Sequence, residues 1–121
     1  MKLFSEYLIE NDNTEKIKIW IKKLKLNGRT LKYVTKELIT YDICKIAVKQ
    51  NGFALEFVPK KFKNNEICEI AVKESGNALS LVPENLKTKE LCEIALKQDK
   101  HALEFVPKKL IPDVEWNLSK K

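Results

Sequence analysis

Hydrophobic and polar positions along most of this chain return with a fixed period of 24 residues. The segment Cys44-Lys45-Ile46-Ala47-Val48-Lys49 returns at residues 68–73 and again at residues 92–97. The same step links Ala54, Ala78 and Ala102, and then the Val-Pro pairs that begin at Val58, Val82 and Val106. A constant period of this length is typical of stacked supersecondary units, each of which buries its apolar face against the next unit.

The first half of each period predicts an α-helix of about ten residues. Thr40, Asn64 and Thr88 stand where a side chain would cap the helix N-terminus. A carboxylate follows in the first turn and a lysine lies in the last turn, and both placements favour the helix dipole. The apolar positions of the first unit cover roughly 200° of the helix surface, which is wider than the apolar stripe of a helix that lies at the protein surface. These positions are Ile43, Cys44, Ile46, Ala47 and Val48. We therefore expect each such helix to be sandwiched between two neighbours, with Ala47, Ala71 and Ala95 permitting close approach.

The second half predicts a tight turn, a short helix and a proline turn. In the first unit the short helix covers residues 53–58 and ends before Pro59, because proline disfavours helical geometry in the preceding residue. A one-turn helix at residues 60–62 follows, and we expect Phe62, Leu86 and Leu110 to fold back onto the core. Asn51-Gly52 and Ser75-Gly76 predict a helix stop with glycine in the left-handed region. The third unit has Asp99-Lys100 instead, so we expect its turn to be strained or differently shaped.

The pattern predicts an all-α fold, a short right-handed α-solenoid of stacked helix-turn-helix repeats that forms one domain over residues 1–121. Tetratricopeptide, ankyrin and HEAT units are longer than 24 residues, and the strand pattern of leucine-rich repeats is absent.

Terminal units of such arrays depart from the consensus. Ile17, Trp20, Ile21 and Leu24 form the narrower stripe of an end helix, and Leu3, Phe4, Tyr7 and Leu8 predict a separate short helix before it. The expected parts are N-terminal capping helices at 1–26, a divergent half unit at 27–40, repeats at 41–64, 65–88 and 89–112, and a C-terminal cap at 113–121.

Charge and composition change this picture little. The net charge is +6, but Arg29 is the only arginine, and the lysine, isoleucine and asparagine content suggests an AT-rich genome of a bacterium, phage or intracellular parasite. Arginine makes the bidentate base contacts of many specific nucleic-acid readers, so the charge alone is weak evidence for such a role. No apolar run approaches the roughly 20 residues of a membrane helix. The first residues become acidic too early for a signal peptide, so we expect a cytoplasmic protein, in the source cell or in a host.

The candidate reactive residues favour packing over chemistry. Cys44, Cys68 and Cys92 share one repeat position, and helix axes about 8–10 Å apart place them too far from one another for disulfides. His101 is the only histidine, so a zinc site lacks ligands, and we expect buried free thiols. The phosphate loop, the nucleophile elbow and the paired histidines of common enzyme motifs are absent. We therefore expect neither an enzyme nor a cofactor nor a small-molecule substrate, the alternative being a general base at His101.

One motif resembles a known family. Ala47-Val48-Lys49-Gln50-Asn51-Gly52-Phe53-Ala54-Leu55 is similar to the core of the tandem repeats called domain of unknown function 4116, over about residues 27–110. The turn departs from that motif in the second and third copies, and the prolines after each short helix are a local variation. The resemblance implies an array of helical repeats, and it implies no activity.

Positions that differ between copies are the candidates for function, because a binding repeat keeps its framework and varies its surface. The first set lies at the turn and comprises Phe53, Asn77 and His101, with Phe53 as a candidate anchor for a partner unless it folds onto its neighbour. Other variable positions are Lys45/Glu69/Glu93, Lys60/Glu84/Lys108 and Lys61/Asn85/Lys109. Lys60, Lys61, Lys108 and Lys109 form a basic set at the proline turns, and Lys25, Lys49, Lys73 and Lys97 are expected to form a ladder along one edge. Pairing with glutamates four residues earlier, at Glu69 and Glu93, is the structural alternative for that ladder.

These observations favour a non-enzymatic module or scaffold that binds another protein. The alternative is a small inhibitor of a nucleic-acid machine, such as a phage anti-CRISPR protein, whose basic edges bind RNA or a ribonucleoprotein. We expect no membrane partner in either case. The two hypotheses differ in salt dependence, since contacts to a nucleic acid weaken steeply as salt rises.

Overall fold

The protein is all-helical over the part of the chain that its structure describes. The structure is a computed structural model that describes residues 4–111, with side chains described from residue 14 onward. The α-helices are α1 (Phe4–Leu26), α2 (Tyr41–Gln50), α3 (Asn65–Glu74) and α4 (Lys89–Gln98). Each helix of a repeat has ten residues, as the sequence predicts.

The second half of each 24-residue repeat consists of a six-residue 3-10 helix before the Val-Pro pair and a three-residue 3-10 helix after it, whereas the preceding half unit has a six-residue helix followed by a turn at 36–38. The six-residue helices are η1 (Gly28–Tyr33), η2 (Gly52–Phe57), η4 (Gly76–Leu81) and η6 (Lys100–Phe105). The three-residue helices are η3 (Lys60–Phe62), η5 (Glu84–Leu86) and η7 (Lys108–Leu110). Extended backbone at Val58, Val82 and Val106 ends η2, η4 and η6 before the proline. The predicted short helices of the repeats are therefore confirmed, and η1 lies within the expected half unit at 27–40.

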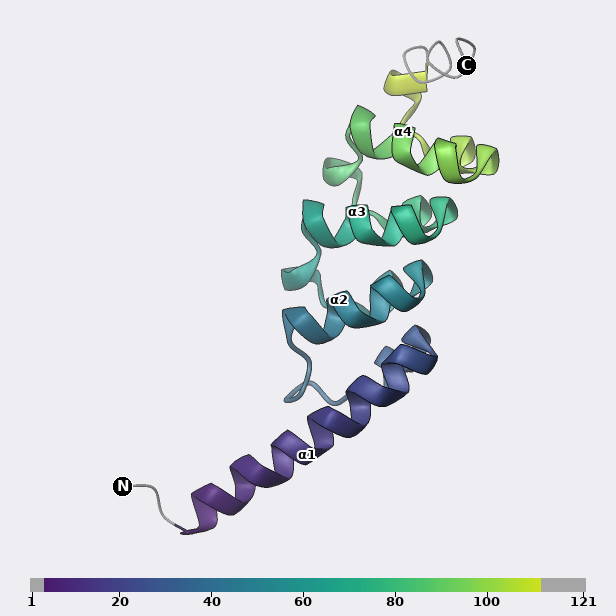
Figure 1. Cartoon of the computed structure of the whole chain (residues 1–121). Coiled ribbons are helices and arrows are strands. Elements are labelled where there is room, and N and C mark those ends of the chain that lie inside the picture. The colour runs from purple at the N-terminus through teal and green to yellow at the C-terminus, as the bar shows by residue number, and fades with distance from the viewer. Residues whose placement is uncertain (1–3, 112–121) are drawn as a thin grey trace.

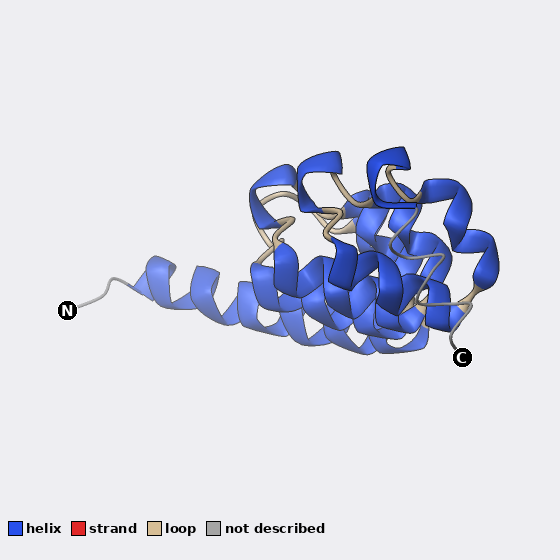
Figure 2. Cartoon of the chain, turned by 90° about the horizontal axis from the view of Figure 1, so that it is seen from above, coloured by secondary structure: helices blue, strands red, loops and turns tan. Residues whose placement is uncertain are grey.

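The units are stacked on one another (Figure 1), with α2, α3 and α4 as successive, similarly oriented layers. α2 contacts both α1 and α3, and α3 contacts both α2 and α4, which confirms the predicted sandwiching of the repeat helices. The six-residue helices form a second column, because η2 contacts η1 and η4, and η4 contacts η6. Seen from above the stack, α1 extends beyond the other helices (Figure 2).

The repeat helices begin at side-chain caps. The side chains of Thr40, Asn64 and Thr88 accept hydrogen bonds from the backbone N–H groups of Ile43, Ile67 and Leu91. The same caps recur in the turn, where the side chains of Asn27, Asn51 and Asp99 each accept from the backbone N–H two residues later. A capping side chain at this position satisfies a backbone donor that would otherwise have no partner in the helix.

The turn glycines have a different role from the one predicted. None of the described glycines has a positive φ, so the left-handed helix stop is wrong. Instead, each glycine lies against the carbonyl oxygen of an alanine in the next helix, where a Cβ atom would overlap it. The pairs are Gly28 with Ala47, Gly52 with Ala71, and Gly76 with Ala95. The stop itself is extended backbone at Asn51, Ser75 and Asp99.

The third turn is not strained, which corrects a second prediction. Asp99 has φ −155° and ψ 118°, close to the −150° and 113° of Asn51. Lys100 fits there because an extended residue followed by a 3-10 helix makes no special demand on the backbone. Lys100 belongs to the last six-residue helix of the described chain, and its side chain is exposed.

The core is a continuous apolar column through all the units. No polar or charged side chain among those described is buried, and Cys44, Cys68 and Cys92 are fully buried free thiols. Burial raises the pKa of all three thiols, that of Cys44 to about 11. Phe62, Leu86 and Leu110 are half-buried against the column, as predicted.

The N-terminal region is one helix rather than two. α1 is continuous from Phe4 to Leu26, because neither glycine nor proline interrupts these residues, so the separate short helix is wrong. Leu24 is buried and Ile17, Trp20 and Ile21 are half-buried, which confirms the narrower stripe. The side chains of Leu3, Phe4, Tyr7 and Leu8 and the expected C-terminal cap at 113–121 lie outside the described part.

Candidate functional site

The structure joins two of the three predicted turn residues through a shared carboxylate. The Asn77 side-chain amide donates to Asp99 Oδ2 at 2.7 Å, and the His101 backbone N–H donates to Asp99 Oδ1 at 2.9 Å. His101 Nδ1 lies 2.9 Å from the same oxygen. The backbone and then the side-chain contact with His101 hold the pKa of Asp99 below its usual value. Asn77 is thereby committed to a contact between units, although its buried Oδ1 has no hydrogen-bond partner among the described residues.

Phe53 occupies the same turn position one unit before Asn77 and is not part of the hydrogen-bonded group around Asp99. Its side chain is 38% exposed, so it is partly covered and still reaches solvent. Its backbone N–H donates to Asn51 Oδ1 at 2.9 Å, which places it at the start of η2. The turn therefore presents one apolar and one imidazole side chain in separate units.

The basic residues are exposed but divided between units. Lys60 and Lys61 lie in η3 and Lys108 and Lys109 in η7, while the intervening η5 carries Glu84, whose carboxylate pairs with Lys87 Nζ at 2.8 Å. The four residues of the predicted ladder, Lys25, Lys49, Lys73 and Lys97, are all exposed. Lys49, Lys73 and Lys97 lie at equivalent positions of α2, α3 and α4, whereas Lys25 lies at the end of the obliquely placed α1 (Figure 1). The predicted pair between Glu69 and Lys73 is present at 3.5 Å.

A row of isoleucines crosses the α2–α4 layer, at the position that Ile46 holds among the apolar residues expected to be sandwiched between helices. Ile46, Ile70 and Ile94 are only half-buried, so they pack on the core and also reach the surface. One helical turn before each isoleucine lies a carboxylate, and one turn after it lies a lysine. Between α2 and α3 this face is hollowed by a groove of about 380 Å³, lined by Asp42, Lys45, Ile46, Lys49 and Ile70. The apolar positions cover roughly 200° of the helix surface. A pattern this wide includes residues at its edge, and these could reach solvent even though the centre of the pattern is buried.

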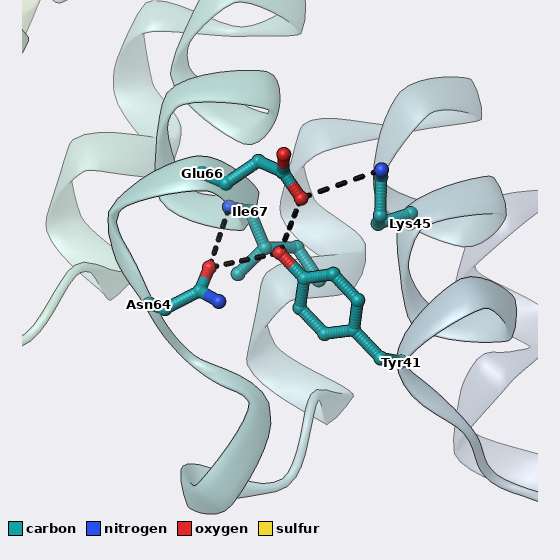
Figure 3. Close-up of polar contacts among 5 residues, drawn as sticks. All are labelled: Tyr41, Lys45, Asn64, Glu66 and Ile67. Carbon is teal, nitrogen blue, oxygen red and sulfur yellow. Dashed lines mark hydrogen bonds and ion pairs between the residues drawn. The ribbon is translucent and has the colours of Figure 1, made fainter.

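At the N-terminal ends of α2 and α3 a polar cluster joins the two helices (Figure 3). The Tyr41 hydroxyl donates to Glu66 Oε1 at 2.6 Å and lies 3.0 Å from Asn64 Oδ1, the atom that caps α3. Lys45 Nζ lies 3.3 Å from the same glutamate oxygen. The Tyr41 ring meets Phe62 edge-on, with ring centroids 6.1 Å apart.

The cluster perturbs the acid–base properties of its members. The hydrogen bond from Tyr41 and then the contacts with Lys45 lower the pKa of Glu66. Loss of hydration and then the hydrogen bond to Glu66 raise the pKa of Tyr41. The cluster is a surface contact that joins two units, and sequence reasoning missed it because Tyr41 differs from its counterparts in the other units.

The equivalent place between α3 and α4 is a hollow of about 230 Å³. Its lining is Asn65, Glu69, Leu86, Thr88, Glu90, Leu91 and Ile94. Here Asn65 replaces the tyrosine and Glu69 replaces the lysine of the preceding junction, so the space that Tyr41 and Lys45 fill one unit earlier is open. The sequence signalled this site only through the Lys45/Glu69/Glu93 variation.

Two classes of site are not found in the described part of the chain. Its histidine, cysteine, aspartate and glutamate side chains do not gather in groups of three that could hold a metal ion. None of its helices combines the length and the apolar character that crossing a membrane requires.

Comparisons with known proteins identify the family. The model of the family described as Domain of unknown function (DUF4116) matches twice in tandem, at residues 17–63 and 64–111. Each match spans about two of the 24-residue units, and the boundary falls at the cap residue Asn64. Comparisons with curated proteins and with solved structures gave no match. The two matches cover most of the chain, and it therefore belongs to the DUF4116 family.

Proposed function

We propose that the protein is a non-enzymatic protein-binding module, built as a short α-solenoid, whose docking face is the outer surface of α2, α3 and α4. Positions that carry the same or similar apolar residues in every unit are buried or half-buried, whereas the positions that differ between units are exposed or half-buried. This division leaves the stack intact while its surface is adapted to a partner.

The observation that carries the proposal is the isoleucine row between a row of carboxylates and a row of lysines. Half-buried Ile46, Ile70 and Ile94 offer apolar area that a partner can cover at small cost in side-chain entropy, because each is already packed on the core. The flanking charges would set orientation and association rate more than affinity. The groove beside Ile46 and Ile70 gives a partner side chain a place to enter.

Affinity capture from the source cell, followed by mass spectrometry, tests this proposal when wild type is compared with Ile70→Gln. We expect a protein partner that wild type retains and Ile70→Gln loses, while the circular dichroism spectrum of the variant remains helical. Phe53→Ser is the matched control, since Phe53 is also partly exposed but lies at the turn. Capture that survives Ile70→Gln and fails with Phe53→Ser would move the docking site to the turn and overturn the proposal, as would the absence of any protein partner.

The alternative proposal, a small inhibitor of a nucleic-acid machine, is supported by the exposed lysines of η3, η7 and the last turns of α2–α4. Such an inhibitor would bind RNA or a ribonucleoprotein through several phosphate contacts, so its affinity would fall steeply between low and physiological salt. An interface centred on the isoleucine row would depend weakly on salt. The salt dependence of the captured complex, with and without ribonuclease treatment, distinguishes the two.

A further inference from the structure

The two junctions between repeat helices can be compared residue by residue, because the same 24-residue step relates them. The first junction lies between α2 and α3, and the second lies between α3 and α4. The later helix of each junction contributes similar acceptor groups: Asn64 and Glu66 in the first correspond to Thr88 and Glu90 in the second. The apolar floor corresponds as well, with Phe62 replaced by Leu86 and Ile70 by Ile94. The two junctions differ in the earlier helix, where the first junction has the aromatic ring of Tyr41 and the ammonium group of Lys45.

The first junction shows which side chains pack against these acceptor groups and the apolar floor. Tyr41 places its ring edge against Phe62 and its hydroxyl on Glu66, and Lys45 places its ammonium group on the same carboxylate. In the second junction Asn65 is too short to reach across, and Glu69 brings a carboxylate where the first junction has a cation. The result is the open hollow of about 230 Å³ beside Leu86 and Ile94.

The charges that line the hollow indicate which chemical group would bind there. Glu69 has one ion-pair partner, Lys73 at 3.5 Å, and Glu90 has none among the described residues. The hollow therefore presents two carboxylates, one of them without an ion-pair partner among the described residues, above an apolar floor. An aromatic ring would cover that floor and a cation would complement the carboxylates, as both do one unit earlier.

We propose that the α3–α4 hollow is a pocket for a helix of a partner protein that carries an aromatic residue followed four positions later by lysine or arginine. Tyr41 and Lys45 have this spacing on α2, and residues four apart lie on the same face of a helix. A partner helix can present the same pair from the solvent side, which is the recognition of a helix by a groove. This inference rests on the proposed protein-binding function and specifies the partner at one end of the docking face.

An NMR titration of the full chain tests the pocket with a defined probe. The probe is an alanine-based helical peptide containing Tyr-Ala-Ala-Ala-Lys, and the control peptide has glutamate in place of the lysine. We expect the probe to shift the amide signals of Leu86, Thr88, Glu90 and Ile94, and the control peptide to bind about tenfold more weakly or worse. Equal binding of both peptides, or shifts confined to another part of the chain, would overturn the pocket.

Two double variants exploit the repeat as an internal control. Asn65→Tyr combined with Glu69→Lys recreates the first junction in the second and should fill the hollow and abolish the shifts. Tyr41→Asn combined with Lys45→Glu opens the first junction, so a second set of shifts should appear around Phe62 and Ile70. Glu90→Gln, an exposed single change, keeps the test available if a double variant fails to fold, and it should weaken binding of the lysine peptide alone. Peptide binding that none of these variants alters would contradict the proposal.

The outcomes separate this inference from the proposed function. If the peptide does not bind but Ile70→Gln abolishes capture of the partner, the docking face stands and the pocket fails. If the peptide binds as expected but capture is unaffected by Ile70→Gln, the pocket stands and the docking face fails.

Discussion

Gly52 lies directly against the carbonyl oxygen of Ala71, one unit further along the chain. That oxygen also accepts the backbone N–H of Ser75 at 2.9 Å, so it belongs to the last turn of α3. The contact therefore holds the start of η2 against the end of the next helix. Gly28 with Ala47 and Gly76 with Ala95 repeat it at the neighbouring junctions, which ties each unit to its successor at one point.

Gly52→Ala should destabilise the protein by roughly 1–3 kcal/mol, because the added methyl group must push the Ala71 backbone away. Urea unfolding followed by circular dichroism measures the loss. Lys100→Ala is the matched control, since it places alanine at the same repeat position where the side chain is already exposed. Equal stability of wild type and Gly52→Ala would contradict the close contact as the reason for glycine.

Ala71→Leu should also destabilise, again by roughly 1–3 kcal/mol, because Ala71 is fully buried between neighbouring elements and a larger side chain overpacks the contact. The same urea titration measures it. Glu74→Leu, at an exposed position of the same helix, should leave the free energy of unfolding nearly unchanged. An Ala71→Leu protein as stable as wild type would be incompatible with the sandwiched position of α3.

The Tyr41–Glu66–Lys45 cluster should make stability depend on pH in the acidic range. Because the pKa of Glu66 is lowered in the folded state, its contribution is present above the ordinary value of 4.5 and is lost as the pH falls through the lowered one. The difference in unfolding free energy between wild type and Glu66→Gln should therefore be largest near neutral pH and shrink below 4.5. Glu90→Gln removes a carboxylate from the same first-turn position of α4, so it controls for the helix dipole. A pH dependence of the same size in both variants would assign the effect to the dipole and not to the cluster.

The three buried thiols should react slowly in the native protein. Burial raises the pKa of Cys44 to about 11 from an ordinary value of 9.0, and the thiolate is the reactive form. A thiol-specific chromogenic reagent at mildly alkaline pH should modify the native chain only at the rate of unfolding and should modify all three thiols at once in urea. Above pH 9.0 the unfolded chain loses thiol protons that the folded chain retains, so stability should fall as the pH approaches 11. Rapid labelling of Cys44 without unfolding would show that the column is open there.

The repeat determined much of the structure in advance, because helix length, caps and the buried stripe depend on local patterns that recur in every unit. Thr40, Asn64 and Thr88 cap their helices as predicted, and the proline after Val58 ends η2. The role of Gly52 could not be predicted from its own turn, since it depends on how closely the next helix approaches. The Phe4–Leu26 helix was divided in two because the apolar pattern weakens at its centre while its backbone does not break.

The candidate site shows the same division more sharply. By itself the sequence determined that the chain is an all-helical array of 24-residue units and which positions vary among them. Only the tertiary structure decided that Tyr41 and Lys45 of one unit meet Glu66 of the next, and that their counterparts leave a hollow beside Glu69 and Glu90. The physical reason is that a repeat pattern specifies the face each side chain occupies, whereas the partners across a junction follow from the distance and tilt between stacked helices.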